Sequence, residues 1–337
     1  MKTESKLNHI YGLDILKIIS CIAVVGLHTF SRSGETIPQL LFMSCGFAIP
    51  IFFMVNGYLL LSRDVKPKKL LSKILHFTLL AFIWSTLLSV LYYLKDGTIF
   101  NPILDTLSVL FLQKGVMSHF WYLGGLILLY SIFIPLSLKG SSFVRKSVKL
   151  FCLISFVGAM SMDALTIIMN MFKLAGGYSI QSYIPQTFRL WTWILYFTLP
   201  IVIHDIRWVK GNGSKYLLLP AFVLKLAYDF LIGFKVLGVS LPEFYYDNIF
   251  TIFFATVLFA GVKDIEVKSE RLRCIIDEVS ADILGIYITH MLVKRVLLHM
   301  LKFTSVPMQI LQLILTFAGA LMLTSVIRRA PVLRRLV

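Results

Sequence analysis

Apolar stretches, each close to the length that crosses a lipid bilayer, recur along the whole chain. A bilayer core of roughly 30 Å needs about 20 mainly apolar residues at 1.5 Å each in an α-helix. Such stretches lie near residues 10–30, 39–61, 70–94, 119–138, 149–170, 187–204, 215–234, 247–262, 280–300 and 308–327. Since 58% of the 337 residues are hydrophobic and only 15% are charged, the composition is not that of a soluble domain. The sequence therefore predicts an all-α polytopic membrane protein with about ten transmembrane helices.

The ten segments are expected to form one unit, because no internal repeat or low-complexity stretch divides the chain. The first segment, 10–30, contains charged residues and has no obvious small-residue cleavage site, so it is interpreted as a retained span and not as a signal peptide. Residues 101–113 are apolar but too short to span, and they are expected at an interface or in a re-entrant segment. We therefore treat 1–337 as a single integral-membrane domain whose last span, 308–327, precedes a short basic tail, 328–337.

Lysine and arginine are distributed unevenly between alternate loops. Of the 33 basic residues, 22 lie on the side that both termini share, 9 lie on the opposite side, and Lys17 and Lys225 lie within spans. Basic loops stay in the cytoplasm, so both termini are predicted to be cytoplasmic. This distribution also accounts for the net charge of +16 without a nucleic-acid partner, because the charge is spread over six cytoplasmic segments.

The four cysteines show no spacing typical of a metal site or of a disulfide framework. Three of them, Cys21, Cys45 and Cys152, lie in apolar segments, and Cys274 lies in a loop. Neither a metal nor a tightly bound cofactor is therefore predicted.

The first span carries three ionisable residues, Asp14, Lys17 and His28. Lys17 and His28 are 11 positions apart, which is three helical turns plus about 20°, and Asp14 precedes Lys17 by three, so all three share one face. Ionisable residues within a span are costly and usually mark a functional site. The alternative is that Asp14 and Lys17 form an interfacial pair in which Lys17 snorkels to the cytoplasmic headgroups.

Further polar residues lie in other spans. His290 falls near the middle of the ninth span, and Tyr287, one turn earlier, is expected to hydrogen-bond on the same face; a satisfied core histidine is an equal alternative. His119 and Trp121 begin the fourth span, where aromatic residues either anchor the interface or bind a sugar face. Lys225 precedes Asp229 by four, which favours a structural ion pair. The remaining intramembrane acid, at position 163, has no partner nearby in the sequence.

Four stretches follow one another in a recognisable order: GLDILKIISCIAVVGLHTF (12–30), IPIFFMVNGYLL (49–60), HFWYLGGLILLYSIFIPL (119–136) and VSADILGIYITHMLV (279–293). Their order and spacing resemble the membrane-bound acyltransferase 3 family across nearly the whole chain, and within it the enzymes that O-acetylate bacterial surface glycans. In that family the first span carries a basic residue, usually arginine, and 11 positions later a histidine that is needed for acyl transfer. The resemblance implies that Lys17 and His28 take these places. Two departures are the lysine itself, which cannot make the two-pronged contact of arginine, and Asn56 in place of the usual serine.

The resemblance implies an O-acyltransferase in the bacterial inner membrane, in contact with lipid, with cytosolic acetyl-CoA or another acyl-CoA as donor. The expected acceptor is a hydroxyl of a surface glycan or of its lipid-linked precursor. His28 and His290 are the predicted catalytic residues, and Lys17, Asp14, His119 and Trp121 are the predicted substrate-binding residues. His28 acts either as a general base or through an acyl-histidine. The alternative from another class is a transporter or flippase that uses the intramembrane charges as a substrate or proton path.

Overall fold

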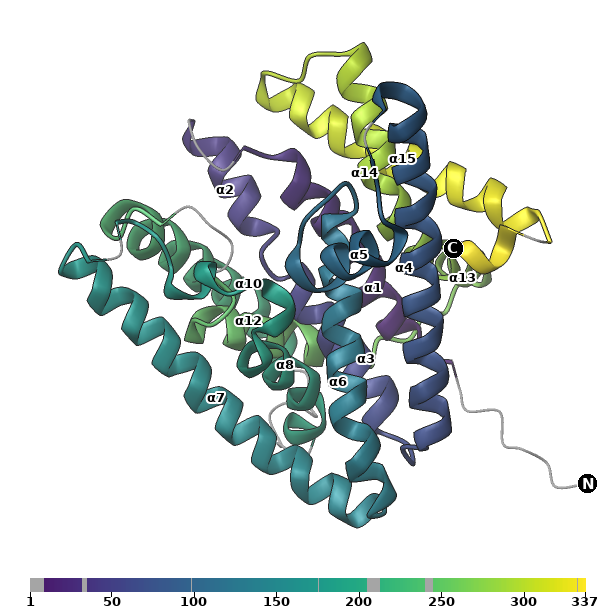
Figure 1. Ribbon diagram of the computed structural model, residues 1–337. Coiled ribbons are helices and arrows are strands. Elements are labelled where there is room, and N and C mark those ends of the chain that lie inside the picture. Colours follow the sequence, from purple (N-terminus) through teal and green to yellow (C-terminus); the bar gives the residue numbers. More distant parts are fainter. Residues whose placement is uncertain are drawn as a thin grey trace, which may run out of the picture.

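The computed structural model describes residues 9–31, 35–97, 99–174, 176–204, 213–239, 245–331 and 333–337, and these contain helices and no strand (Figure 1). Each of the ten predicted segments coincides with a helix or with a pair of consecutive helices. Within the described residues, eight are long and apolar enough to cross a membrane. They are α1 (Tyr11–Thr29), α2 with α3 (Thr36–Ser44 and Ala48–Leu61), α4 (Pro67–Asp96), η2 with α6 (Ser118–Phe120 and Trp121–Leu138), α7 (Ser141–Met171), α10 with the π-helix η5 (Gly213–Ala227 and Tyr228–Val236), α14 (Ile283–Met300) and α15 (Val306–Arg329).

The other two predicted spans are shorter. They are α8, Leu190–Ile203, and α12, Ile249–Lys263, with 14 and 15 residues. At 1.5 Å per residue each covers little more than 20 Å, so by length alone neither crosses a full bilayer core. Both are largely buried among other helices, and α8 packs against α3 and α7. The remaining short helices are α5 (Pro102–Leu107), η1 (Ser108–Leu112), η3 (Ile180–Tyr183), η4 (Gln186–Phe188), α13 (Glu270–Ala281) and η6 (Leu333–Leu336).

The second predicted span, 39–61, is not one continuous helix. It breaks at residues 45–47 into α2 and α3. The carbonyl of Met43, in the last turn of α2, accepts a hydrogen bond from the backbone N–H of Gly46 and another from the Lys225 ammonium on α10. These donors satisfy a carbonyl that a helix end leaves without an intrahelical partner, so the break is supported from outside the span.

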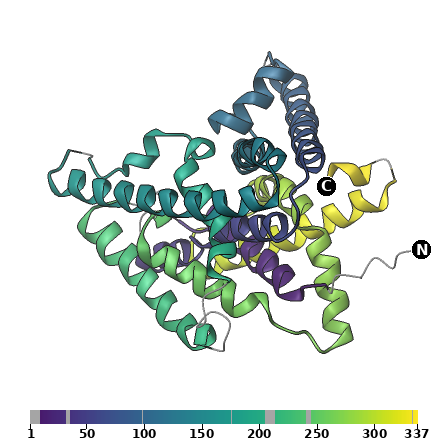
Figure 2. The same cartoon turned by 90° about the horizontal axis from the view of Figure 1, so that it is seen from below.

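The first helices lie inside the bundle. α1 contacts α3, α12, α13, α14 and α15, and in the view from below its purple ribbon lies beside green and yellow helices (Figure 2). In the most apolar stretch of each helix, 61% of the residues are buried in α1, compared with 28% in α4 and in α7 and 22% in α15. The exposed leucines of α4, such as Leu75, Leu79 and Leu91, therefore form a surface suited to lipid.

Close helix contacts depend on glycine, and Gly57 and Gly12 are two examples. A Cβ on Gly57 of α3 would lie 1.8 Å from the carbonyl oxygen of Phe197 on α8, and one on Gly12 of α1 would lie 2.2 Å from the carbonyl oxygens of Val262 and Lys263. Small residues let membrane helices approach to backbone contact. The position of α1, which carries the predicted site residues, is thus fixed by contact with α12 at its first turn.

α13 was not predicted from the sequence, which assigned these residues to a loop before the ninth span. It is amphipathic and has no buried residue. Ser269 caps it by accepting a hydrogen bond from the N–H of Leu272 at 3.4 Å, and Arg273 lies 5.5 Å from the ring of Tyr11 on α1. On the predicted topology, this helix lies along the cytoplasmic end of α1.

Candidate active site

Three histidines from three separate elements meet near the predicted outer end of α1. The rings of His28 on α1 and His290 on α14 have centroids 5.3 Å apart, and the ring of His119 on η2 lies 5.1 Å from that of His290. His290 is fully buried and His119 is 6% exposed. The structure therefore brings together the two predicted catalytic histidines and one predicted substrate-binding residue, although they are far apart in the sequence.

The hydrogen bonds of His290 define which ring nitrogen is available for chemistry. Nδ1 lies 2.7 Å from the carbonyl oxygen of Tyr287 and 3.2 Å from that of Ile286. A carbonyl oxygen only accepts, so Nδ1 carries the proton and Nε2 carries the lone pair. This Nε2 is buried and has no hydrogen-bond partner within the part of the chain that the structure describes. It is thus available to accept a proton from a bound substrate.

Two further side chains tie the three elements together. The hydroxyl of Tyr287 donates to the backbone carbonyl of His119, and the ammonium of Lys294 donates to the backbone carbonyl of His28. The sequence predicted a hydrogen bond from Tyr287 on the face of His290; the backbone carbonyl of Tyr287 makes this contact with the ring, whereas its hydroxyl reaches η2. Both bonds come from α14, so this helix holds the ends of α1 and η2 around its own histidine.

At the other end of the predicted stripe, Lys17 lies 2.7 Å from Asp14, which confirms the expected pair. Asp14 also contacts the imidazole of His9. The Lys17 side chain is 27% exposed, whereas that of Asp14 is 6% exposed. The buried carboxylate therefore compensates a lysine that remains accessible to an anionic ligand.

A cavity of about 200 Å³ begins at Lys17 and is bounded by Tyr287, whose ring contacts those of His119 and His290 at 5.3 and 6.2 Å. Lys17 and His28 are separated by about 16 Å along α1. Most of the lining between Lys17 and Tyr287 is apolar. This geometry suits a ligand with an anionic head at Lys17 and a narrow chain directed towards the histidines.

Asn56 lines the same cavity, although it was not among the site residues predicted from the sequence. Its amide donates to the hydroxyl of Tyr122 at 2.9 Å and to the carbonyl of Phe52 at 3.0 Å. Asn56 could have been noticed in the sequence as a polar residue in an otherwise apolar helix. That it faces a cavity, however, depends on how α3 packs against α6. The substitution of asparagine for the serine expected at this position therefore changes the wall of the cavity.

Trp121 is not exposed at the membrane interface as an anchor would be. It is 8% exposed, its ring lies 5.2 Å from that of Trp193 on α8, and its carbonyl accepts a hydrogen bond from Thr187. Tyr122 is buried as well. Both aromatic residues pack inside the bundle, so the interpretation as interfacial anchors is wrong. The described ring contacts of Trp121 are with Tyr122 and Trp193 and do not include the histidines.

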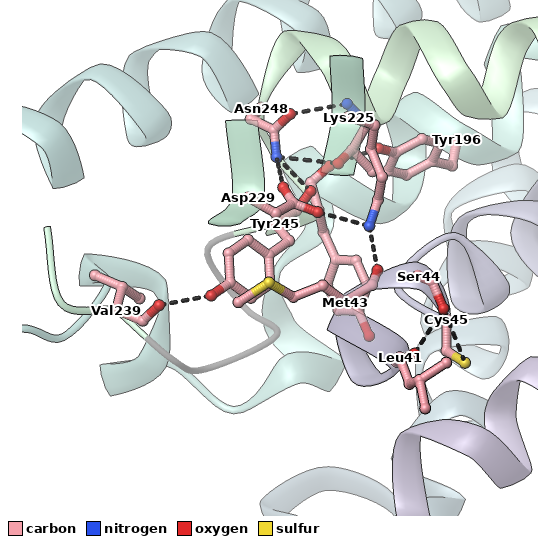
Figure 3. Close-up of polar contacts among 12 residues, drawn as sticks. Leu41, Met43, Ser44, Cys45, Tyr196, Lys225, Asp229, Val239, Tyr245 and Asn248 are labelled. Atoms are coloured by element: carbon pink, nitrogen blue, oxygen red, sulfur yellow. Dashed lines mark hydrogen bonds and ion pairs between the residues drawn. The ribbon is translucent and has the colours of Figure 1, made fainter. Parts of the chain in front are cut away.

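A second buried polar cluster surrounds Lys225, and Figure 3 shows it in close-up. Lys225 lies 2.6 Å from Asp229, which confirms the predicted pair, and its ammonium also donates to the carbonyl of Met43. The amide of Asn248 donates to Asp229 at 3.3 Å and to the carbonyl of Tyr245 at 2.7 Å. Both members of the pair are fully buried. The cluster joins α2, α10, η5 and the start of α12.

The remaining intramembrane acid also has a partner, although the sequence offered none nearby. The hydroxyl of Tyr228 on η5 donates to Asp163 on α7 at 3.1 Å. A buried carboxylate in an apolar environment is costly unless it is hydrogen-bonded. The bond is therefore a structural contact between α7 and η5.

Among the described residues, one group has the composition of a metal site: His9, Asp14 and Asp277, whose ligand atoms lie within 4.8 Å of one another. His9 and Asp277 are about half exposed. Asp14 already holds the ammonium of Lys17, which would stand next to any cation and oppose its binding. The group is better described as a polar contact between the start of α1 and α13.

Comparison with known proteins gives one match over nearly the whole chain. The profile of the acyltransferase 3 family, described as "Acyltransferase domain", matches residues 10–329. Over 125 residues the chain is 30% identical to an amino-acid racemase from Enterococcus faecalis, a match that covers 33% of this chain but only 17% of the racemase. No solved structure matches the chain.

Proposed function

Because the chain belongs to the membrane acyltransferase 3 family, we propose that it transfers an acetyl group from cytosolic acetyl-CoA to a hydroxyl of a cell-surface glycan or of its lipid-linked precursor. The proposed location is the bacterial inner membrane. The observation that carries the proposal is the meeting of His28, His119 and His290 beyond a cavity that begins at Lys17.

The two ends of the cavity suit the two parts of acetyl-CoA. Its nucleotide end is anionic and its pantetheine arm is long and narrow. Lys17 with its supporting Asp14 lies at the predicted cytoplasmic end and would contact a phosphate of the donor. The apolar cavity would hold the arm, with the thioester directed past Tyr287. The predicted excess of cytoplasmic lysine and arginine adds an attractive field for the donor.

The proposed step is direct acyl transfer. The acceptor oxygen attacks the thioester carbonyl while His28 takes the hydroxyl proton, a new C–O ester bond forms, the C–S bond breaks, and the proton passes to the sulfur to give free coenzyme A. His290 is the second catalytic residue in this scheme, because its Nε2 lone pair is available to take part in the same proton transfer. The low polarity of the buried site strengthens each of these contacts.

Sealed inverted membrane vesicles supplied with radiolabelled acetyl-CoA provide the test. The wild-type protein is expected to label glycan, and His28→Ala is expected to reduce the rate at least 100-fold, in line with the loss of a general base. His299→Ala is the matched control, because His299 is an exposed histidine near the end of α14. Undiminished labelling by His28→Ala would remove that residue from the chemistry, and absence of labelling by the wild type would contradict the proposed function.

A further inference from the structure

A second cavity, of about 350 Å³, lies between the last third of α4, the short helices α5 and η1, and the segment that leads into η2. It is separate from the cavity at Lys17, since the two share no lining residue. On the predicted topology α4 runs outward, so this cavity lies near the outer membrane surface. Its volume falls within the usual range for small-ligand sites.

The lining combines hydrogen-bonding groups with aromatic rings. Asp105 accepts a hydrogen bond from Ser89 at 2.9 Å, and an aspartate carboxylate has capacity for further donors. The hydroxyl of Tyr92 accepts from Arg295 at 2.8 Å, and its own proton can be donated to a ligand. Phe100 and Ser108 also line the cavity.

A wall residue and a hydrogen bond place the cavity beside the histidine cluster. Met117 belongs to its wall, and His119 follows two residues later, so their Cα atoms are at most about 7 Å apart. Arg295, which holds Tyr92, lies five residues beyond His290 on α14, a rise of about 7.5 Å. A ligand in the cavity would therefore lie near the elements that carry His119 and His290.

The chemistry of the lining discriminates between ligand classes. The lining carries one carboxylate, Asp105, and one ammonium, Lys114, so their charges offset and the cavity offers no net positive field for the polyanionic nucleotide of coenzyme A. Both groups form hydrogen bonds with neutral hydroxyls, Asp105 as acceptor and Lys114 as donor. Aromatic rings provide a flat apolar surface for the C–H face of a sugar ring.

We infer that this cavity binds a neutral saccharide unit of the acceptor, so that acceptor enters from the outer side while donor enters at Lys17. The inference rests on the proposed acyl transfer and assigns the acceptor a site of its own. Residues Ser89, Tyr92, Phe100, Asp105 and Ser108 form this saccharide pocket.

Two variants test the saccharide pocket. Asp105→Asn removes the charge but keeps an oxygen for Ser89, and Ser108→Trp fills the cavity. Both are expected to lower glycan labelling in the vesicle assay roughly tenfold or more, Asp105→Asn because a hydrogen bond to a charged group is lost and Ser108→Trp because the indole occupies the volume of the saccharide. Equilibrium binding of radiolabelled acetyl-CoA by the purified full chain is expected to remain unchanged.

Matched controls come from the predicted cytoplasmic side. Asp64 accepts a hydrogen bond from Ser141 at 2.7 Å, so Asp64→Asn makes the same aspartate-to-asparagine change outside the saccharide pocket. Ser142→Trp makes the same serine-to-tryptophan change at an exposed position. Size-exclusion profiles in detergent check that each variant is folded. Full glycan labelling by both folded pocket variants would overturn the inference.

A direct binding measurement separates this inference from the proposed function. Saturation-transfer NMR on the detergent-purified chain uses the methyl glycosides of glucose, galactose and N-acetylglucosamine, with glycerophosphocholine as a headgroup probe. We expect a glycoside signal that Ser108→Trp abolishes, whether or not acetyl transfer is observed. A Ser108-dependent signal from glycerophosphocholine alone, or no Ser108-dependent glycoside signal, would overturn the saccharide assignment.

Discussion

At the scale of single residues, the site depends on side chains that satisfy one another across elements. Lys294 and Tyr287 donate hydrogen bonds to the backbone carbonyls of residues 28 and 119. Neither donor occupies Nε2 of His290, which stays available. Lys17 is held by Asp14 and remains partly exposed. The two ends of α1 are thus prepared for different tasks, with donor binding proposed at one end and proton transfer at the other.

Lys17 provides a prediction at this scale. Lys17→Ala is expected to raise the KM for acetyl-CoA roughly tenfold or more, because one charge-assisted hydrogen bond to phosphate is lost. Lys17→Arg is expected to retain binding, since guanidinium also binds phosphate and is the residue usual in the family. Steady-state kinetics in vesicles measure both, with Lys268→Ala as an exposed cytoplasmic control. A fall in kcat at constant KM would instead mean that Lys17 acts on the transition state.

At the scale of helices, buried polar contacts fasten elements that would otherwise meet only through apolar surfaces. The Lys225 cluster of Figure 3 connects the broken second span to α10 and η5, and Tyr228 connects η5 to α7. Glycine contacts, such as that of Gly57 with Phe197, set the spacing between helices.

The ion pair itself gives the prediction at this scale. Lys225→Met leaves Asp229 buried without its partner, and we expect a loss of about 3–5 kcal/mol of folding stability, whereas Lys225→Met combined with Asp229→Leu is expected to recover most of it. Thermal unfolding in detergent measures the difference, and Lys215→Met on the exposed face of α10 is the control. Equal destabilisation by the single and double variants would show that the bond to Met43, and not the unpaired charge, dominates.

At the scale of the whole molecule, the bundle has buried central helices, long lipid-suited helices around them, and an exposed amphipathic helix, α13, at one end of α1. The charge distribution between loops predicts that α13 lies in the cytoplasm. Donor and acceptor would then approach the histidines from opposite sides of the membrane. This division agrees with two cavities that share no residue.

Cys274 makes the predicted orientation measurable. It is exposed on α13, whereas Cys21, Cys45 and Cys152 are buried. A membrane-impermeant maleimide is expected to label Cys274 in inverted vesicles and not in intact cells. Lys302→Cys, in a Cys274→Ser background, is expected to show the opposite pattern, because residue 302 is exposed on the predicted outer side. Labelling of Cys274 in intact cells would mean that the protein has the opposite orientation to the predicted one.

The amino-acid sequence by itself determined the helical segments, because a chain in lipid must satisfy its backbone hydrogen bonds within each span. It also determined the local pairs Asp14–Lys17 and Lys225–Asp229, since helical geometry alone brings residues three or four apart together. The tertiary structure alone decided that His28, His119 and His290 meet, that α2 and α3 separate, and that Asn56 faces a cavity. Helical period specifies which residues share a face, but which faces meet depends on the packing of every helix at once.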